Sequence, residues 1–139
     1  MPALTATQLR STPGVVTASG RLAPASGRWL DASMPTPIPG QVADALVGKG
    51  FNSFDDLRSA IWEHIGNNPE LNGGFTPRNV QLMQDGYAPL VPPQYLNESG
   101  AFGKSFNLHH IDPIGNGGPV YDLSNLHIVS PKVHYGIHY

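Results

Sequence analysis

Residues 106–139 read FNLHHIDPIGNGGPVYDLSNLHIVSPKVHYGIHY, and five of the six histidines of the 139-residue chain lie in this segment. Its first part is apolar and alternating enough for a strand, and the GNGGP that follows is a turn with room for positive φ. NLHIVS predicts a second strand with Leu126 and Ile128 on one face. Ser130 suits the cap of a helix whose first residue is Pro131. The predicted order is strand, turn, strand and helix.

Four of these histidines have the spacing of a metal site. His134 and His138 are four residues apart on the predicted helix, so both rings project from one face and can bind one divalent ion. His109 and His110 are neighbours on the first strand and point to opposite sides, so one can be a third ligand while the other faces a different pocket. Three neutral ligands leave a coordination position open, which is typical of catalytic sites. The fourth imidazole is then available as a general base, and spacing alone leaves open which of the two it is.

Composition limits the remaining possibilities. The chain has no cysteine, which excludes disulfides and thiolate metal sites. Its net charge is −2 with a pI near 6.3, whereas a generic nucleic-acid binder is usually basic. No apolar run is long enough for a membrane span, and no signal peptide is recognisable. The other two histidines, His64 and His127, are interpreted as structural or exposed.

The N-terminal part is expected to be a flexible linker or arm over residues 1–25. It is rich in Ala, Ser, Thr, Gly and Pro, and it shows neither a helical nor an alternating pattern. Residues 1–28 carry three arginines and no acid. The folded domain is expected to begin near residue 26, where Trp29 and Leu30 supply the first core anchors.

Two helices are predicted in the middle of the chain. Residues 37–51 predict a short helix, with Gly50 as its left-handed C-terminal residue. Residues 52–71 predict the clearest helix, capped by Ser53. The apolar face of that helix comprises Phe54, Leu57, Ile61 and Ile65. The stretch that follows is expected to be irregular with one helical turn at 77–83, so the predicted class is α+β, mostly helical and irregular before a C-terminal ββα unit.

The C-terminal pattern also resembles a known motif. It has the form His109-His110, fourteen residues, Asn125, eight residues, His134, three residues, His138. This is similar to the HNH, or ββα-metal (His-Me finger), endonuclease motif in the version found in the DNase domains of E-type colicins and S-type pyocins. The surrounding LHH, GG, VYD and PK, and the upstream WLD, SFDDLRSAIWE and GYAP, extend the likeness.

The resemblance implies roles for five residues. His109, His134 and His138 match the metal ligands, and His110 matches the general base that deprotonates the attacking water. Asn125 matches the asparagine that fixes the loop and the orientation of the base histidine, so the implied catalytic set is His110, Asn125 and His109. Zinc or nickel suits three histidines, and magnesium or manganese is the alternative for turnover.

The resemblance covers residues 26–139, with the motif at 104–139. It implies a monomeric domain of a larger toxin, either a bacteriocin or a secreted antibacterial effector. Such a toxin is released by its producer, acts in the cytoplasm of competitor bacteria and cuts double-stranded DNA with little sequence preference. No membrane segment is expected in the chain.

Two departures from close relatives concern the site. Relatives carry an arginine and a glutamate where this chain has Gly103 and Asn107. Lys104 can replace part of the lost charge and Asn107 can hydrogen-bond a neighbour, so these two residues and Lys132 are candidate substrate contacts. The low basicity leaves open an RNase of the same fold. The two replacements leave open a catalytically weakened binding module that keeps the metal for stability.

The resemblance also implies a partner, because relatives are held inactive by an immunity protein that binds beside the active cleft. Residues 85–93, DGYAPLVPP, resemble that exosite. Tyr87 and Leu90 are its candidate anchors, and the alternative is that both belong to the core.

Overall fold

The structure is a computed structural model that describes the backbone of residues 4–138 and the side chains of residues 4–137. The predicted C-terminal unit is confirmed. Strand β4 (Asn107–His110) pairs antiparallel with β5 (Leu126–Val129), and helix α6 (Pro131–His138) follows. Strand β2 (Thr36–Pro37) pairs with the other edge of β5, giving a three-stranded sheet in the order β2-β5-β4.

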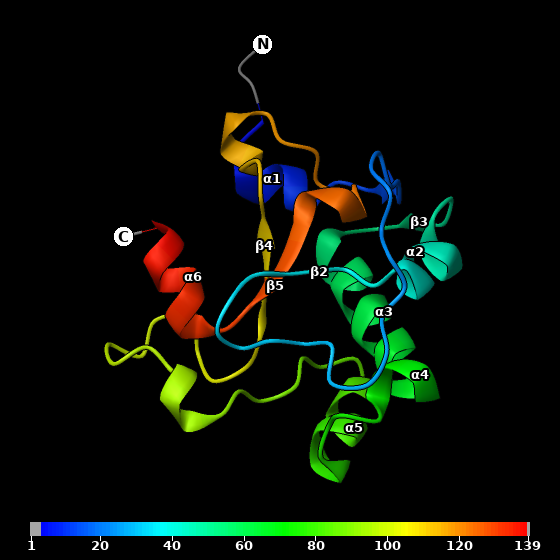
Figure 1. The fold of residues 1–139 in the computed structure, drawn as a ribbon. Helices are drawn as coiled ribbons and strands as arrows, with labels where there is room; N and C mark the ends of the chain where they lie inside the picture. Colours follow the sequence, from blue (N-terminus) through cyan, green and yellow to red (C-terminus); the bar gives the residue numbers. More distant parts are fainter. Residues whose placement is uncertain (1–3, 139) are drawn as a thin grey trace.

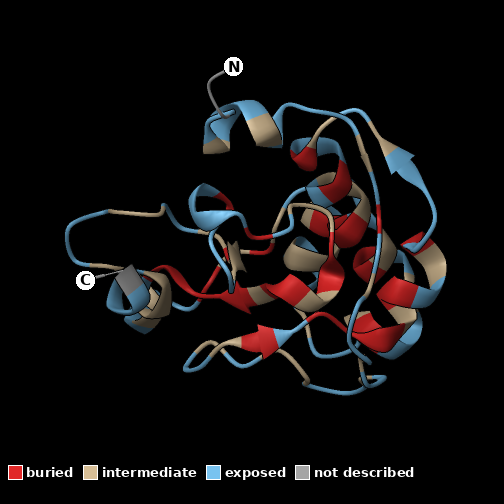
Figure 2. Cartoon of the chain, turned by 90° about the horizontal axis from the view of Figure 1, so that it is seen from above, coloured by how far each residue is buried: buried red, intermediate tan, exposed pale blue. Residues whose placement is uncertain are grey.

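Figure 1 shows this sheet between α6 on one side and α3 (Phe54–Asn67) on the other. Leu126 and Ile128 are 1% and 0% exposed and join the hydrophobic core, as predicted for one face of the second strand. Buried residues gather around α3 and the central strands, while the outer loops are exposed (Figure 2). The sheet thus has a core face and a second side where α6 packs against β4 and β5.

Helix α3 forms as its sequence predicts. The Ser53 side chain accepts a hydrogen bond from the Asp56 amide at 3.3 Å, which satisfies a free donor of the first turn. The predicted apolar face is fully buried and consists of Phe54, Leu57, Ile61 and Ile65. Helices α4 (Pro69–Asn72) and α5 (Pro77–Gln84) pack against α3, and the predicted helical turn at 77–83 is confirmed as α5.

The short helix before α3 is also confirmed, with one correction at its end. Helix α2 runs over Gly40–Leu46, and the left-handed glycine that follows is Gly48, with φ of +89°. Gly50 instead begins β3 (Gly50–Phe51). Both glycines follow the apolar stripe closely, and the spacing did not distinguish them. Within residues 4–138 there are also three 3-10 turns, namely η1 (Pro93–Tyr95), η2 (Ile114–Asn116) and η3 (Leu123–Asn125).

Residues 4–25, within the segment predicted to be a flexible linker or arm, have defined secondary structure and contribute to the core. Helix α1 (Ala6–Arg10) starts with a capping box, and β1 (Gly14–Val15) pairs with β3. Val16 is 1% exposed and belongs to the core. The segment is held by backbone hydrogen bonds, by the buried Val16 and by the partly buried Ala18, Leu22 and Ala25, whose spacing follows neither a helical nor a strand period. Residues 1–3 lie outside the described residues.

Asp122 fastens this N-terminal segment to the loop before β5. Its Oδ1 accepts hydrogen bonds from the amides of Ser19 at 3.1 Å and Ser124 at 2.9 Å. Burial raises the pKa of Asp122, but the hydrogen bonds from Ser19 and Ser124 outweigh it, so the pKa lies below the ordinary 3.8. The folded state therefore favours the carboxylate.

We expect Asp122→Ala to lower the free energy of unfolding by about 1–3 kcal/mol at pH 7, because two part-buried amides, those of Ser19 and Ser124, lose their acceptor. Because the pKa of Asp122 is lower in the folded than in the unfolded state, the carboxylate stabilises the fold at pH values above its unfolded pKa. This stabilisation is lost as the pH falls through the folded pKa. The difference from the wild type should therefore shrink below pH 3.8. Urea unfolding at pH 7 and below pH 3.8 measures the difference in the free energy of unfolding between the variant and the wild type. Asp44→Ala is the control, because Asp44 is exposed. Equal stability of the two variants at pH 7 would contradict the assignment.

None of the helices within the described residues is long and apolar enough to cross a membrane.

Candidate functional site

Two histidines from separate elements meet on the α6 side of the sheet. His109 on β4 and His134 on α6 have ring centroids 5.3 Å apart, with the planes at 65°. Both side chains are half-buried. The expectation that the two adjacent histidines divide between two environments is confirmed, and His109 is the one beside His134.

The donor set on this side fits a divalent cation. His138 lies one turn after His134 on α6, although its side chain is outside the described residues. Among the described side chains no group of three or more His, Asp or Glu comes together, so the structure presents two of the three predicted ligand rings. The ligand role of His138 stays a prediction from its spacing, four residues after His134. Neutral imidazoles without a thiol suit ions such as Zn²⁺ or Ni²⁺.

His110 lies in a different environment and has a defined tautomer. Its Nε2 is 3.1 Å from the carbonyl oxygen of Val120, and its ring packs against Phe54 at a centroid distance of 4.7 Å. A carbonyl oxygen only accepts, so Nε2 carries the proton and Nδ1 keeps the lone pair. Burial lowers the pKa of His110 and the nearby charge of Arg10 lowers it further, against the opposing hydrogen bond to Val120. The ring is therefore neutral near pH 7 and can accept a proton.

Asn125 organises the loop between the two strands. Its side chain accepts a hydrogen bond from the Asp112 amide at 2.8 Å and donates to the carbonyls of Asp112 and Pro119, each at 3.0 Å. It is 9% exposed. Val120, which holds His110, directly follows Pro119. These contacts hold the loop, while the role of Asn125 in orienting His110 stays a prediction.

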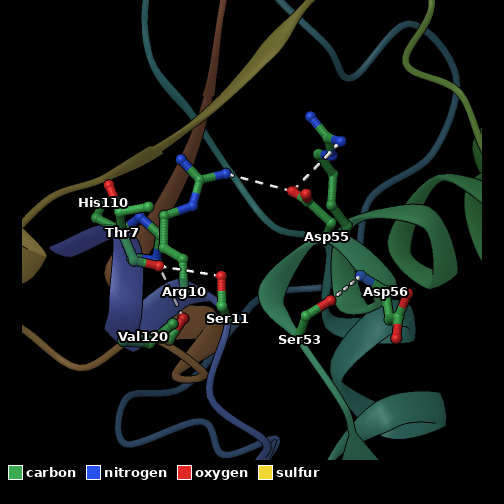
Figure 3. Close-up of polar contacts among 9 residues, drawn as sticks. Thr7, Arg10, Ser11, Ser53, Asp55, Asp56, His110 and Val120 are labelled. Atoms are coloured by element: carbon green, nitrogen blue, oxygen red, sulfur yellow. Dashed lines mark hydrogen bonds and ion pairs between the residues drawn. The ribbon is translucent and has the colours of Figure 1, made fainter.

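Arg10 is a functional candidate that the sequence prediction missed. Helix α1 brings its guanidinium carbon to 5.2 Å from the Phe54 ring centroid, and its Nη2 to 3.4 Å from Oδ1 of Asp55 (Figure 3). Arg58 reaches the same oxygen at 3.4 Å. Arg10 and His110 thus contact the same Phe54 ring. The sequence signal for it is the presence of three arginines and no acidic residue in residues 1–28.

A cavity of about 420 Å³ is lined by Arg10, Phe54 and His134, whereas His109, His110 and Asn125 are not among its described lining residues. Its wall includes side chains from α1, α3 and α6 and from the segment before β4. Among the lining residues are Arg10, Phe54, Arg58, Tyr87, Asn107 and His134. The cavity therefore combines two cations with one of the two metal-site histidines, a combination suited to an anionic substrate.

The remaining predicted contacts divide between this cavity and the surface. Asn107 lines the cavity and hydrogen-bonds His134 at 2.9 Å, so the expectation that it bonds a neighbour is confirmed. Lys104 and Lys132 are exposed, and neither is among the described residues that line the cavity. Their substrate contact stays a prediction.

The two candidate exosite residues lie on different cavities. Tyr87 is 65% exposed and lines the cavity that contains His134, so it is not a core residue. Leu90 is half-buried and lines a second, more apolar cavity of about 410 Å³ with Trp29 and Phe75.

The other two histidines, His64 and His127, belong to no group of three or more ligating side chains among the described residues. His64 on α3 is half-buried, and its Nε2 has no hydrogen-bond partner among the described residues. His127 lies opposite His109 in the β4–β5 register, and burial lowers its pKa.

Comparison with known proteins places this geometry in a family. The family described as Colicin/Pyocin-S2, DNase domain, matches residues 14–139. Colicin-E8 of Escherichia coli is 40% identical over 130 residues, which cover 91% of this chain and 60% of that protein. Pyocin-S2 of Pseudomonas aeruginosa is 40% identical over 134 residues, 93% of this chain and 18% of that protein. The chain thus spans only part of the length of these relatives.

Solved structures agree with the sequence relatives. A mutant nuclease domain of pyocin S8, crystallised with its cognate immunity protein, superposes with a TM-score of 0.81 at 36% identity, covering 90% of this chain and 98% of that chain. The DNase of pyocin AP41, in complex with its immunity protein, superposes with a TM-score of 0.80 at 38% sequence identity. The superposition covers 91% of this chain and 93% of that chain. The match from residue 14 also agrees with the folded N-terminal segment found here. The chain belongs to the colicin and pyocin DNase domain family.

Proposed function

We propose that this domain is a metal-dependent DNA endonuclease that cuts with little sequence preference. The observation that carries the proposal is the division of the adjacent histidines, with His109 beside His134 and His110 held apart by Val120. Membership of a DNase domain family supports the substrate. The proposed domain extends from residue 14 to 139, because the segment before residue 26 contributes to the core.

The metal would be held by His109, His134 and His138. Zinc or nickel suits this all-imidazole set, and magnesium or manganese is the alternative for turnover. When bound, the ion supplies positive charge beside the scissile phosphate.

The residues of the chain itself would move and position the reacting groups. His110 accepts a proton from the attacking water at Nδ1, since its Nε2–H donates to Val120. Asn125 keeps the loop before Val120 in place. Arg10 contacts the phosphate backbone, and such contacts fix position without reading sequence. With Lys and Arg numbering 8 in total, binding to DNA is expected to be loose and salt-sensitive.

Arg10→Ala is expected to reduce plasmid cleavage about 10–100-fold, equivalent to a charged hydrogen bond of about 1.5–3 kcal/mol. In a plot of the logarithm of the DNA-binding constant against the logarithm of the salt concentration, the slope should become shallower by about one. Metal affinity should not change. Arg21→Ala is the matched control, because Arg21 belongs to the same segment and lines another cavity. Equal activity of the two variants would remove Arg10 from the site.

We further propose that the domain is the toxic part of a longer bacteriocin or secreted effector. The named relatives are colicins and pyocins, and the matched structures are complexes with immunity proteins. A cognate immunity protein is the proposed partner, bound over the surface that carries Tyr87 and Leu90. The proposed place of action is the cytoplasm of a competitor bacterium.

Cleavage assays on plasmid DNA and on tRNA test the activity against its alternatives. We expect nicking of plasmid in the presence of a divalent ion, and its loss with a chelator. Preferential cleavage of tRNA would instead support the hypothesis that the domain is an RNase of the same fold. A purified chain that binds metal, cuts neither substrate and is harmless when expressed alone would support the binding module, which Gly103 and Asn107 favour.

A further inference from the structure

The orientation of the Asn107 amide is fixed by two backbone carbonyls. Its Nδ2 lies 3.2 Å from the carbonyl oxygen of Phe102 and 3.1 Å from that of Ser105. Carbonyl oxygens only accept hydrogen bonds, so the NH₂ group of Asn107 must face them. The amide oxygen is thereby directed to the other side, where Oδ1 lies 2.9 Å from Nδ1 of His134.

This orientation decides the tautomer of His134. An amide oxygen has no proton to give, so the hydrogen of this contact belongs to Nδ1 of His134. A neutral imidazole carries one N–H, and the lone pair is therefore on Nε2. The carbonyls of Phe102 and Ser105 thus determine, through Asn107, which nitrogen of His134 is the donor atom for a cation.

Phe102 fixes the plane of the same ring. Its ring stacks on His134 with centroids 3.9 Å apart and planes within 22°. Phe102 has φ of +65°, and it is the only non-glycine residue with positive φ among residues 4–138. The conformation that places its ring over His134 also presents its carbonyl to Asn107. An unusual backbone at one residue therefore serves both contacts.

We propose that Asn107 is a positioning residue that selects the Nδ1–H tautomer of His134 and presents Nε2 to the divalent ion, with Phe102 holding the ring plane. The inference rests on the proposed metal role of His134. Outer partners of this kind orient a histidine ligand and set its tautomer. The side chain that departs from the glutamate of close relatives thus keeps a hydrogen-bond acceptor in place.

Nuclear magnetic resonance of the metal-free domain tests the tautomer directly. Long-range ¹H–¹⁵N correlations at about pH 8.5, where histidine is neutral, are expected to show His134 as Nδ1–H. The signals are assigned by their loss in His134→Gln. Asn107→Ala should convert His134 to a mixture or to Nε2–H. Asn107→Asp, which keeps an acceptor, should retain Nδ1–H.

Zinc affinity measured by calorimetry is the second readout. Asn107→Ala is expected to bind zinc about 10–100-fold more weakly, as for loss of an outer partner of a ligand. Asn97→Ala is the matched control, because Asn97 bonds only locally, to Ser99 in an exposed loop, and its zinc affinity should equal that of the wild type. Circular dichroism checks that each variant folds.

Two results would overturn the inference. One is a wild-type His134 in the Nε2–H form, and the other is an Asn107→Ala variant that keeps the Nδ1–H form. If Asn107→Ala does not fold, loss of the Nδ1–H form of His134 in a folded Asn107→Asp variant would also overturn the inference. A wild-type domain that shows Nδ1–H and binds no zinc would instead refute the metal role of His134 and leave the tautomer assignment standing.

Discussion

Replacing His110 with alanine is expected to reduce plasmid cleavage by about 10²–10⁴-fold, the usual contribution of a general base. The reason is the geometry of the ring, whose Nε2 is engaged with Val120 so that Nδ1 is the basic nitrogen. His110 packs against Phe54 and, as the strand neighbour of His109, projects from the opposite face of β4. Zinc affinity should therefore stay at the wild-type value. Cleavage rates and calorimetric zinc titration, measured on the same preparation, separate the two effects.

His64→Ala is the matched control for this experiment. His64 is also a half-buried histidine, and it lines a different cavity beside Lys49. Its cleavage rate should equal that of the wild type. Undiminished nicking by the His110→Ala variant would remove the base assignment, and loss of zinc binding in it would make His110 a ligand instead.

His134→Ala is expected to have the opposite profile. Loss of a ligand ring should weaken zinc binding by more than the roughly 10–100-fold that loss of an outer partner costs. Cleavage should fall in parallel, because the charge beside the phosphate depends on the bound ion. Calorimetry with zinc, followed by cleavage at rising metal concentration, measures both.

Ile137→Ala serves as the control on the same helix, since Ile137 is 44% exposed. It should keep both zinc affinity and cleavage. A His134→Ala variant that binds zinc as tightly as the wild type would exclude His134 from the metal centre.

Local signals in the sequence predicted much of the fold. Ser53 and Pro131 mark helix starts by the chemistry of free backbone donors, and both helices begin where these residues place them. The alternation around Ile128 likewise located β5. The N-terminal segment escaped prediction because Val16 is a single buried side chain, and the backbone hydrogen bonds that fix it have no sequence period.

The candidate site shows the same division. Helical and strand geometry predicted that His134 would share its side of the sheet with one of two adjacent histidines. Spacing left open which of the two it is, the resemblance named His109, and the structure places His109 beside His134. Arg10 could not be placed from sequence, because it is distant from Phe54 along the chain and only the folding of α1 brings the two together. The separation of Tyr87 and Leu90 onto two cavities is also a tertiary property.

The central claim is that imidazoles from β4 and α6 converge on one cation while His110 remains outside its coordination sphere. An anomalous-difference map from crystals of the chain grown with zinc tests it directly. We expect one peak at about 2.0–2.1 Å from ring nitrogens of His109, His134 and His138, the usual Zn–N distance, with Nε2 as the ligand atom of His134. A peak at another place, or coordination by His110, would contradict the account.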